Sequence, residues 1–174
     1  LEAMMPFMTE HYGNPSSIHG FGEPVRKALE AARHQVATLL GAEHDSEIVF
    51  TSCATEANST ALLSAVEALP ERKQIITTVV EHPAILEVCE HLERQGYQIH
   101  RLAVDGQGRL DLDAYAALLS DQVALVSVMW ANNETGTLFP VLEMAQMAKD
   151  KGILFHTDAV QVVGKMPINL ASIA

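Results

Sequence analysis

The chain has 174 residues, of which 48% are hydrophobic and 19% charged, a length and composition typical of a globular protein with one buried core. Its 22 acidic and 11 basic residues give a formal net charge of −11, which argues against nucleic acid or an anionic membrane as a partner and favours small-molecule or basic partners. The sequence has two cysteines, no membrane-length apolar run and no visible signal peptide, so we expect a cytoplasmic protein without a disulfide framework.

Helical patterns dominate the first part of the chain. Residues 1–11 have apolar side chains at roughly helical spacing, and the loop-forming sequence YGNPSSIHGFG follows. The clearest predicted helix comes next, with Pro24 in its first turn and Gly41 just past its end. We therefore expect two parts, a helix-and-loop segment (1–22) and a larger domain (23–174).

From residue 48 onward, predicted strands alternate with predicted helices. The strands are short apolar runs, and turn residues separate them from the helices. The expected strands are residues 48–50, 75–80, 98–102, 123–129 and 153–156, and the expected helices are residues 54–69, 84–95, 112–119 and 141–151. This alternation predicts an α/β fold, a three-layer sandwich in which helices cover both faces of a mostly parallel sheet.

Polar turns follow most of the expected strands. Parallel strands present their carboxyl ends at one edge of the sheet, and ligands bind there in open α/β folds. The strand at 98–102 leads only to a plain turn, so we expect it at the side of the sheet. The other four turns are expected to lie close together, and they are residues 51–56, 81–83, 131–136 and 157–161.

The first of these turns, TSCATE, places small residues and hydroxyl groups where a helix begins. Exposed backbone amides and the helix dipole make such a turn an anion site, most often for phosphate, and Thr55 is the candidate ligand. The structural alternative is an ordinary N-cap formed by Ser52 or Thr55.

The other three turns carry an imidazole, amides and a carboxylate. His82 follows one strand, Asn133 lies beside a second amide in a loop, and Asp158 and Gln161 follow the last strand. His82 could equally be structural, and the amide pair could form an Asx turn. A phosphate-bearing aromatic cation would satisfy all four turns, with its ring nitrogen at Asp158 and its ring under His82. Its phenolic oxygen would lie near Gln161 and Asn133, which is the arrangement expected for pyridoxal 5′-phosphate (PLP).

A few other residues allow different chemistry. His156 and Asp158 lie on one side of a strand and could hold a metal ion in a hydrolase, although no third ligand occurs at a recognisable spacing. Cys53 could be a nucleophile at a helix start, but no base is assigned to it, and a small buried residue is the simpler interpretation. Cys89 and His91 do not share a face of their helix, so we expect no metal site there.

Five longer segments match one family in sequence and in order along essentially the whole chain. They are GNPSSIHGFG, FTSCATEANSTAL, TTVVEHPAIL, VSVMWANNETGTLFP and FHTDAVQVVGKMPI. These segments resemble the cysteine desulfurases of the class V aminotransferase fold, especially the nitrogen-fixation-associated enzymes. The resemblance implies the large domain of a fold type I PLP-dependent enzyme. It also implies site roles for six residues: phosphate binding by Thr55 and the Ala54 backbone, ring stacking and proton movement by His82, contacts near the phenolic oxygen by Asn133 and Gln161, and pairing of Asp158 with the pyridine nitrogen.

The same resemblance implies an activity and partners. Such an enzyme is a homodimeric transferase that takes sulfur from L-cysteine and releases L-alanine. It passes the sulfur, as a cysteine persulfide, to an iron–sulfur scaffold protein, here for nitrogenase. The resemblance also suggests a metal-binding protein through its iron–sulfur role, although we assign no metal ligand in this chain.

Several family features have no counterpart here. The family's Schiff-base lysine follows a Ser-x-His-Lys motif and its persulfide-forming cysteine lies on a later loop; neither occurs in this sequence, nor does the N-terminal Asp-Asn-Asn-Ala-Thr-like motif. Lys165 matches a different family lysine, and neither Cys53 nor Cys89 matches the persulfide-forming one. We therefore expect an incomplete, N-terminal-to-middle part of a desulfurase that is inactive by itself. The alternatives are another enzyme of this fold, such as a selenocysteine lyase or an aminotransferase, the metal hydrolase, and a non-catalytic dimerisation remnant.

Overall fold

The computed structural model describes residues 1–172, and their contacts divide them into two compact units. One unit contains residues 1–49 and 168–172, and the other contains residues 50–167. This grouping places the first long helix with the N-terminal segment; the domain division expected after residue 22 concerns the whole protein and stays a prediction. Within residues 1–172, no helix is both long enough and apolar enough to cross a membrane.

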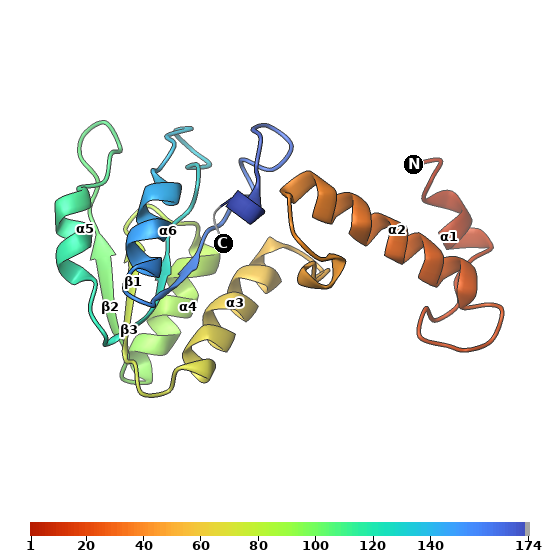
Figure 1. Cartoon of the computed structure of the whole chain (residues 1–174), viewed down its shortest axis with the longest axis horizontal. Coiled ribbons are helices and arrows are strands. Elements are labelled where there is room, and N and C mark those ends of the chain that lie inside the picture. Colours follow the sequence, from red (N-terminus) through yellow and green to blue (C-terminus); the bar gives the residue numbers. More distant parts are fainter. Residues whose placement is uncertain (173–174) are drawn as a thin grey trace. The chain divides into compact units, whose positions relative to one another are not determined.

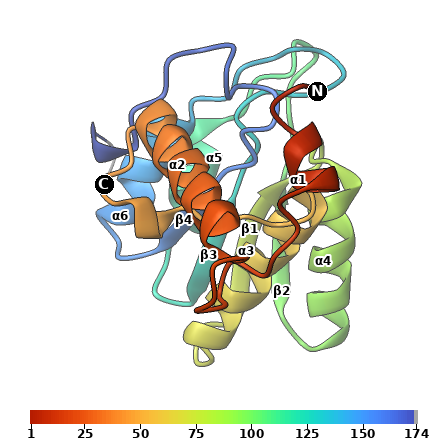
Figure 2. The same cartoon turned by 90° about the vertical axis from the view of Figure 1, so that its right-hand side faces the viewer.

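The first unit is built around one long helix. Its elements are α1 (Met5–Thr9), α2 (Glu23–Leu40) and the short 3-10 helices η1 (Asp45–Glu47) and η2 (Leu170–Ser172) (Figure 2). Helix α2 ends at Gly41, whose φ of 66° lies in the left-handed region and whose N–H donates to the carbonyl oxygens of Ala37 and Thr38. A Cβ at Gly41 would lie 2.5 Å from the side-chain oxygen of Asn169, so both the backbone conformation and the space require glycine. The predicted end of this helix is therefore confirmed.

The second unit contains a parallel sheet. Within the described residues its strands are β1 (Gln74–Thr78), β2 (Gln98–Leu102), β3 (Val123–Ser127) and β4 (Leu154–His156), the first three of which are labelled in Figure 1. Their spatial order is β2-β1-β3-β4 (Figure 2). All three pairs of neighbours are parallel, and Ile75 lies opposite both Ile99 and Leu125. Strand β2 lies at the side of the sheet, as its plain following turn predicts.

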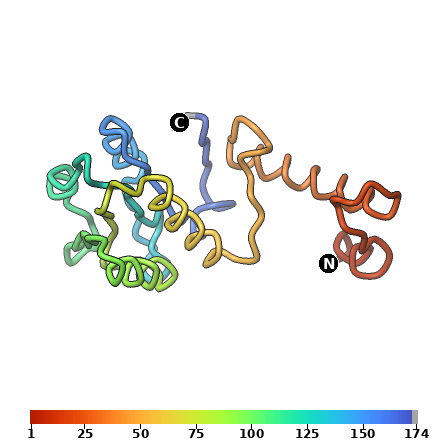
Figure 3. Tube along the Cα trace, turned by 90° about the horizontal axis from the view of Figure 1, so that it is seen from below, coloured from red at the N-terminus to blue at the C-terminus, as the bar shows by residue number. Residues whose placement is uncertain are grey.

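Helices cover both faces of this sheet, as the Cα trace shows (Figure 3). One layer contains α3 (Ala54–Ala68) and α4 (Pro83–Arg94), and the other contains α5 (Leu112–Leu118) and α6 (Val141–Lys149). Neighbouring strand residues point to opposite layers: Leu125 packs with Leu62 and Ile85, whereas Val126 packs in a larger cluster with Tyr115 and Met144. The three-layer α/β fold predicted from the alternation is confirmed.

The strand expected at residues 48–50 is wrong. This segment follows η1 and is not a strand of the described sheet, and Val49 is 77% exposed. Its apolar, β-branched composition fits a strand, but a strand is also defined by the ladder of hydrogen bonds that it forms with a neighbouring strand. Composition alone could not show whether such a ladder forms.

Tyr115 ties the α5–α6 layer together. Its side chain is completely buried, and its hydroxyl donates a hydrogen bond of 2.8 Å to the carbonyl oxygen of Met144. We expect Tyr115→Phe to lower the free energy of unfolding by about 1 kcal/mol in a urea titration, the usual net value of such a bond. Tyr97→Phe is the matched control, because the Tyr97 hydroxyl lies at the surface and receives only a 3.4 Å contact from Lys73. Equal effects of the two substitutions would contradict this prediction.

Candidate active site

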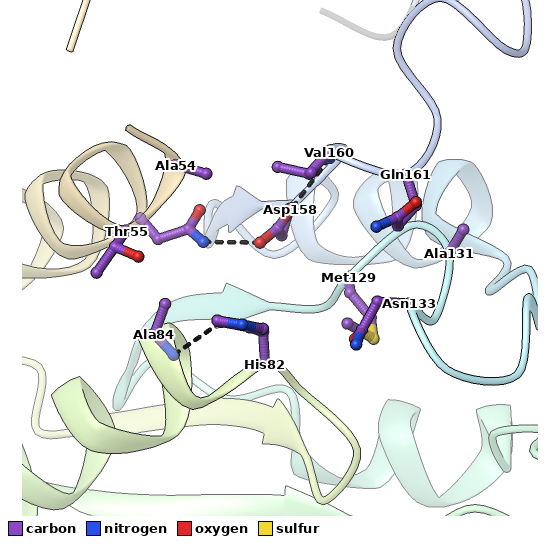
Figure 4. Close-up of a pocket in the computed structure, with 11 residues that line it drawn as sticks. Ala54, Thr55, His82, Ala84, Met129, Ala131, Asn133, Asp158, Val160 and Gln161 are labelled. Carbon is purple, nitrogen blue, oxygen red and sulfur yellow. Dashed lines mark hydrogen bonds between the residues drawn. The ribbon is translucent and has the colours of Figure 1, made fainter. Parts of the chain in front are cut away.

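One pocket lies at the carboxyl edge of the sheet, where the chain order reverses. From β1 the chain crosses to β2 on one side and later to β3 and β4 on the other, and open α/β folds bind ligands at such a switch point. The pocket has a volume of about 210 Å³. It is lined by all six residues predicted as a site, Ala54, Thr55, His82, Asn133, Asp158 and Gln161, and by Asn58, Ala84, Met129, Ala131 and Val160 (Figure 4).

The start of α3 forms one wall. The N-cap residue is Cys53, and neither Ser52 nor Thr55 caps the helix, so the N-cap interpretation of this turn is wrong. The Ser52 amide and hydroxyl instead donate to the Glu56 carboxylate at 2.6 and 2.5 Å, which lowers the pKa of Glu56. The pKa of the Cys53 thiol is also lowered, first by the Glu56 backbone amide and then by the Ser52 hydroxyl. Amides at this helix start therefore stabilise negative charge, as an anion site requires.

His82 lies at the start of α4, on the other side of the pocket. It is the N-cap residue of this helix, and its Nδ1 accepts a 3.1 Å hydrogen bond from the Ala84 backbone N–H. The structural role that the sequence left open is therefore present. It does not exclude chemistry, because a neutral ring that accepts at Nδ1 carries its proton on Nε2. The imidazole is exposed and lines the pocket with its orientation fixed by the cap.

The two adjacent amides after β3 have different surroundings. Asn132 is buried and structural: its side-chain oxygen accepts from the backbone amides of Glu134 and Thr135, both at 2.9 Å, and its amide nitrogen donates to the Val80 carbonyl at 3.1 Å. This is the Asx turn considered for the pair. Asn133 is exposed, lines the pocket and donates to the Glu134 carboxylate at 2.8 Å. Only the second amide is therefore placed to meet a ligand.

Asp158 follows β4 in the chain and is half-buried, and both of its side-chain oxygens accept hydrogen bonds. Oδ1 accepts from the Val160 backbone N–H at 3.0 Å, and Oδ2 accepts from the Asn58 amide nitrogen at 2.7 Å. Asn58 is 5% exposed and belongs to α3, so this bond joins two walls of the pocket. The carboxylate is thereby held in one orientation at the pocket surface.

Sequence reasoning missed Asn58. The sequence does indicate that this residue is buried, because helical spacing places Asn58 on the same face of α3 as the buried residues Leu62, Ala65 and Val66. A polar side chain on the buried stripe of a helix needs a partner, and here the partner is the acid predicted as a site residue.

Gln161 is also held by a neighbour. The Lys165 ammonium group donates a 2.7 Å hydrogen bond to the Gln161 side-chain oxygen. The amide NH₂ of Gln161 is therefore the group left to donate to an acceptor in the pocket.

The residues of the metal-hydrolase alternative have other partners. His156 Nδ1 lies 2.9 Å from the Ser127 hydroxyl, and burial lowers the pKa of the imidazole while the Asp158 charge opposes that shift. In the part of the chain that the structure describes, no three His, Cys, Asp or Glu side chains are grouped so that they could hold a metal ion. Cys53 is exposed, contrary to the buried residue that we expected, whereas Cys89 is buried.

Known proteins are similar to this chain in sequence and in fold. The profile of the family Aminotransferase class-V matches residues 1–174. The chain belongs to the class-V aminotransferase family. It is 66% identical over 170 residues to "Cysteine desulfurase NifS" of Azotobacter vinelandii, and this matched segment covers 98% of this chain and 42% of that protein. It is 64% identical to a cysteine desulfurase of Klebsiella pneumoniae over 97% of this chain and 42% of the relative.

Solved structures with the same fold also resemble this chain in sequence. A "NIFS-like protein" superposes with a TM-score of 0.93 at 42% identity and covers 99% of this chain and 48% of its own length. The structure described as "SspA in complex with cysteine" also has a TM-score of 0.93, at 32% identity, and covers 99% of this chain and 50% of its own length. The chain thus spans less than half the length of the curated class-V relatives named here. The cofactor of this family is PLP.

Proposed function

We propose that this chain carries most of the cofactor cradle of a PLP-dependent cysteine desulfurase, which takes sulfur from L-cysteine and leaves L-alanine. The observation that carries the proposal is the convergence of six residues, from four separate turns, on the single pocket at the switch point. The 66% identity to a protein named cysteine desulfurase supports the choice of this activity over others of the same fold. A solved relative described as a complex with cysteine supports the substrate.

The donor set of the pocket fits PLP. A phosphate needs donors, and the start of α3 offers them at Ala54 and Thr55, where the lowered thiol pKa of Cys53 already indicates a local preference for negative charge. A protonated pyridine nitrogen needs an acceptor, which Asp158 supplies. A phenolic oxygen needs donors, which Gln161 and Asn133 would supply. The lining contains no Lys or Arg, so the helix start has to bind the phosphate in this part of the protein.

PLP, when bound, supplies an electron sink that weakens bonds at the α-carbon of an amino acid and, for cysteine, the bond to sulfur. The chain's own residues position and exchange protons. Asp158, held in place by Asn58, would keep the pyridine nitrogen protonated. The His82 ring, which has Nε2 as its remaining donor, would stack on the cofactor ring. Gln161, oriented by Lys165, would donate its NH₂ to the phenolic oxygen.

Further parts of the proposal rest on the relatives' names. The name NifS supports a role in nitrogen fixation. Delivery of the sulfur to an iron–sulfur scaffold protein is proposed from the family resemblance of the sequence. We also propose a homodimer in the cytoplasm. Neither Cys53 nor Cys89 is assigned the persulfide, because neither matches the family cysteine that forms it.

The experiment separates cofactor binding from turnover. Pyridoxamine 5′-phosphate is the better probe, since it has the phosphate, ring and phenolic oxygen of PLP but cannot condense with surface lysines. We expect saturable binding by fluorescence titration, weaker binding of pyridoxamine without the phosphate, and no alanine from L-cysteine, because the sequence lacks the Ser-x-His-Lys motif. Equal binding of both probes would contradict the phosphate site, and alanine production would contradict the predicted inactivity.

A further inference from the structure

Glu81 is a buried acid beside the pocket that the proposed mechanism does not use. Its side chain is 5% exposed, and it is the sole carboxylate among the buried side chains of residues 1–172. It precedes His82 in the chain but does not line the pocket. Burying a carboxyl group costs free energy unless hydrogen bonds replace its lost hydration, so we consider which groups donate to Glu81.

The contacts of Glu81 join the exits of two neighbouring strands. Oε1 accepts from the Thr78 hydroxyl at 2.8 Å, at the end of β1. The Met129 backbone N–H, just after β3, donates to both oxygens, at 3.0 and 3.2 Å. Met129 itself lines the pocket. One carboxyl group therefore holds the turn after β1, which contains His82, against Met129, the pocket residue that follows β3.

A second bond connects the same two segments. The buried Asn132 amide donates to the Val80 carbonyl at 3.1 Å, one residue before Glu81. The turn is also anchored on its other side, where the Val79 N–H donates to the Leu102 carbonyl at 3.0 Å. The position of His82 relative to β3 is thus set by a small hydrogen-bonded framework with Glu81 inside it.

Among residues 1–172 no cation forms a salt bridge with Glu81. The titratable groups that interact with it are the Asp158 carboxylate, which follows β4, and the Cys89 thiol in α4. Burial, and to a smaller extent the Asp158 charge, raise the pKa of Glu81 to about 7, against the hydrogen bonds from Met129 and Thr78. Near neutral pH the framework therefore contains a group that gains or loses a proton.

We propose that Glu81 is a positioning residue that holds His82 and the Met129 wall at the spacing the cofactor needs. It acts through the Thr78 hydroxyl and the Met129 backbone N–H, and its own side chain does not line the pocket. The positioning role itself rests on hydrogen bonds of this chain, whereas its purpose rests on the proposed function.

The test compares Glu81→Ala with Glu81→Gln. Glutamine keeps an oxygen that can accept from both Thr78 and Met129, whereas alanine removes the acceptor. We expect hydrogen exchange of the Met129 amide to become about tenfold faster in Glu81→Ala and to change little in Glu81→Gln. Pyridoxamine 5′-phosphate should bind about tenfold more weakly to the alanine variant alone. Glu87→Ala is the matched control, because Glu87 is an exposed acid in helix α4, which begins two residues after Glu81.

Each outcome decides something. Unchanged Met129 exchange in Glu81→Ala would overturn the positioning role. Faster exchange with unchanged probe binding would show that the contact does not serve the pocket, which also overturns the proposal. Faster exchange with no probe binding even in the unsubstituted chain would keep the framework but reject the cofactor site.

If the alanine variant does not fold, Glu81→Gln alone still tests the proposal. This variant should remove the dependence of Met129 amide exchange on pH between about pH 6 and about pH 8, after correction for intrinsic exchange. A dependence that persists would contradict the role of Glu81.

Discussion

Replacing Asp158 with asparagine is expected to weaken the binding of pyridoxamine 5′-phosphate by about 10- to 100-fold, the value of a charge-assisted hydrogen bond. An amide at this position cannot hold a proton on the pyridine nitrogen by its charge. The substitution should leave the fold intact: the side-chain oxygen can still accept from Val160, and Asn58 can turn its amide to offer oxygen to the new NH₂. Fluorescence titration gives the affinity, and circular dichroism checks the fold.

Two further variants make this prediction specific. Asp150→Asn is a matched control, because Asp150 also accepts a 2.7 Å amide hydrogen bond, from Gln146, but lies at the surface as the C-cap residue of α6. A double variant, Asn58→Asp with Asp158→Asn, keeps both the hydrogen bond and the net charge while moving the charge to α3. We expect this exchange to remain weak. Full recovery would show that charge in the pocket matters and its position does not, and normal affinity of Asp158→Asn alone would remove the basis of the cofactor assignment.

Raising the pH through neutrality should destabilise the fold through Glu81. Its pKa is raised from the ordinary 4.5 to about 7, so the folded state holds a proton that the unfolded chain has already released. The stabilising contribution is complete below about pH 4.5 and is lost as the pH rises through about 7. A rise of this size corresponds to about 3 kcal/mol, at about 1.4 kcal/mol per pKa unit. Urea titrations at about pH 5 and about pH 8 would measure it.

A second buried group acts in the opposite direction and needs a control. Burial lowers the pKa of His156 below 6.5, so its contribution is present above that value and is lost as the pH falls. His156 is present in both the unsubstituted chain and Glu81→Gln. The difference between their free energies of unfolding therefore removes the His156 contribution and leaves that of Glu81. We expect the glutamine variant to lose most of the decline in stability between about pH 5 and about pH 8. The same pH dependence in both proteins would mean that Glu81 does not titrate near pH 7.

The residues around the pocket were predicted from the sequence in two ways. His82, Asn133, Asp158 and Gln161 each follow a predicted strand that the structure confirms, and parallel strands bring such turns to one edge. Thr55 was chosen at a predicted helix start, although the strand expected before it does not form, and Ala54 came from the family resemblance. The structure brings them together there, although their roles toward a cofactor stay predictions. The position of β2 at the side of the sheet was also predicted from local sequence, since the turn after it is a plain turn without a candidate ligand-binding residue.

Other features depended on partners that a one-dimensional pattern does not show. The composition of residues 48–50 suits a strand, but no strand lies beside them in the described structure. Ser52 looked like a helix cap, yet its amide and hydroxyl are bonded to Glu56. Between two adjacent asparagines, only contacts distant in sequence show that Asn132 supports the loop while Asn133 faces the pocket.

The sequence by itself determined the order of helices and strands, the parallel α/β fold and the turns that carry the site, because these follow from periodicity and from the direction of parallel strands. Only the tertiary structure decided which groups hold the site in place. Asn58 reaches Asp158 across 100 positions of sequence, and Glu81 reaches Met129 across 48. Hydrogen bonds of this kind depend on distances between packed elements, and those distances are fixed when the layers come together rather than by neighbours along the chain.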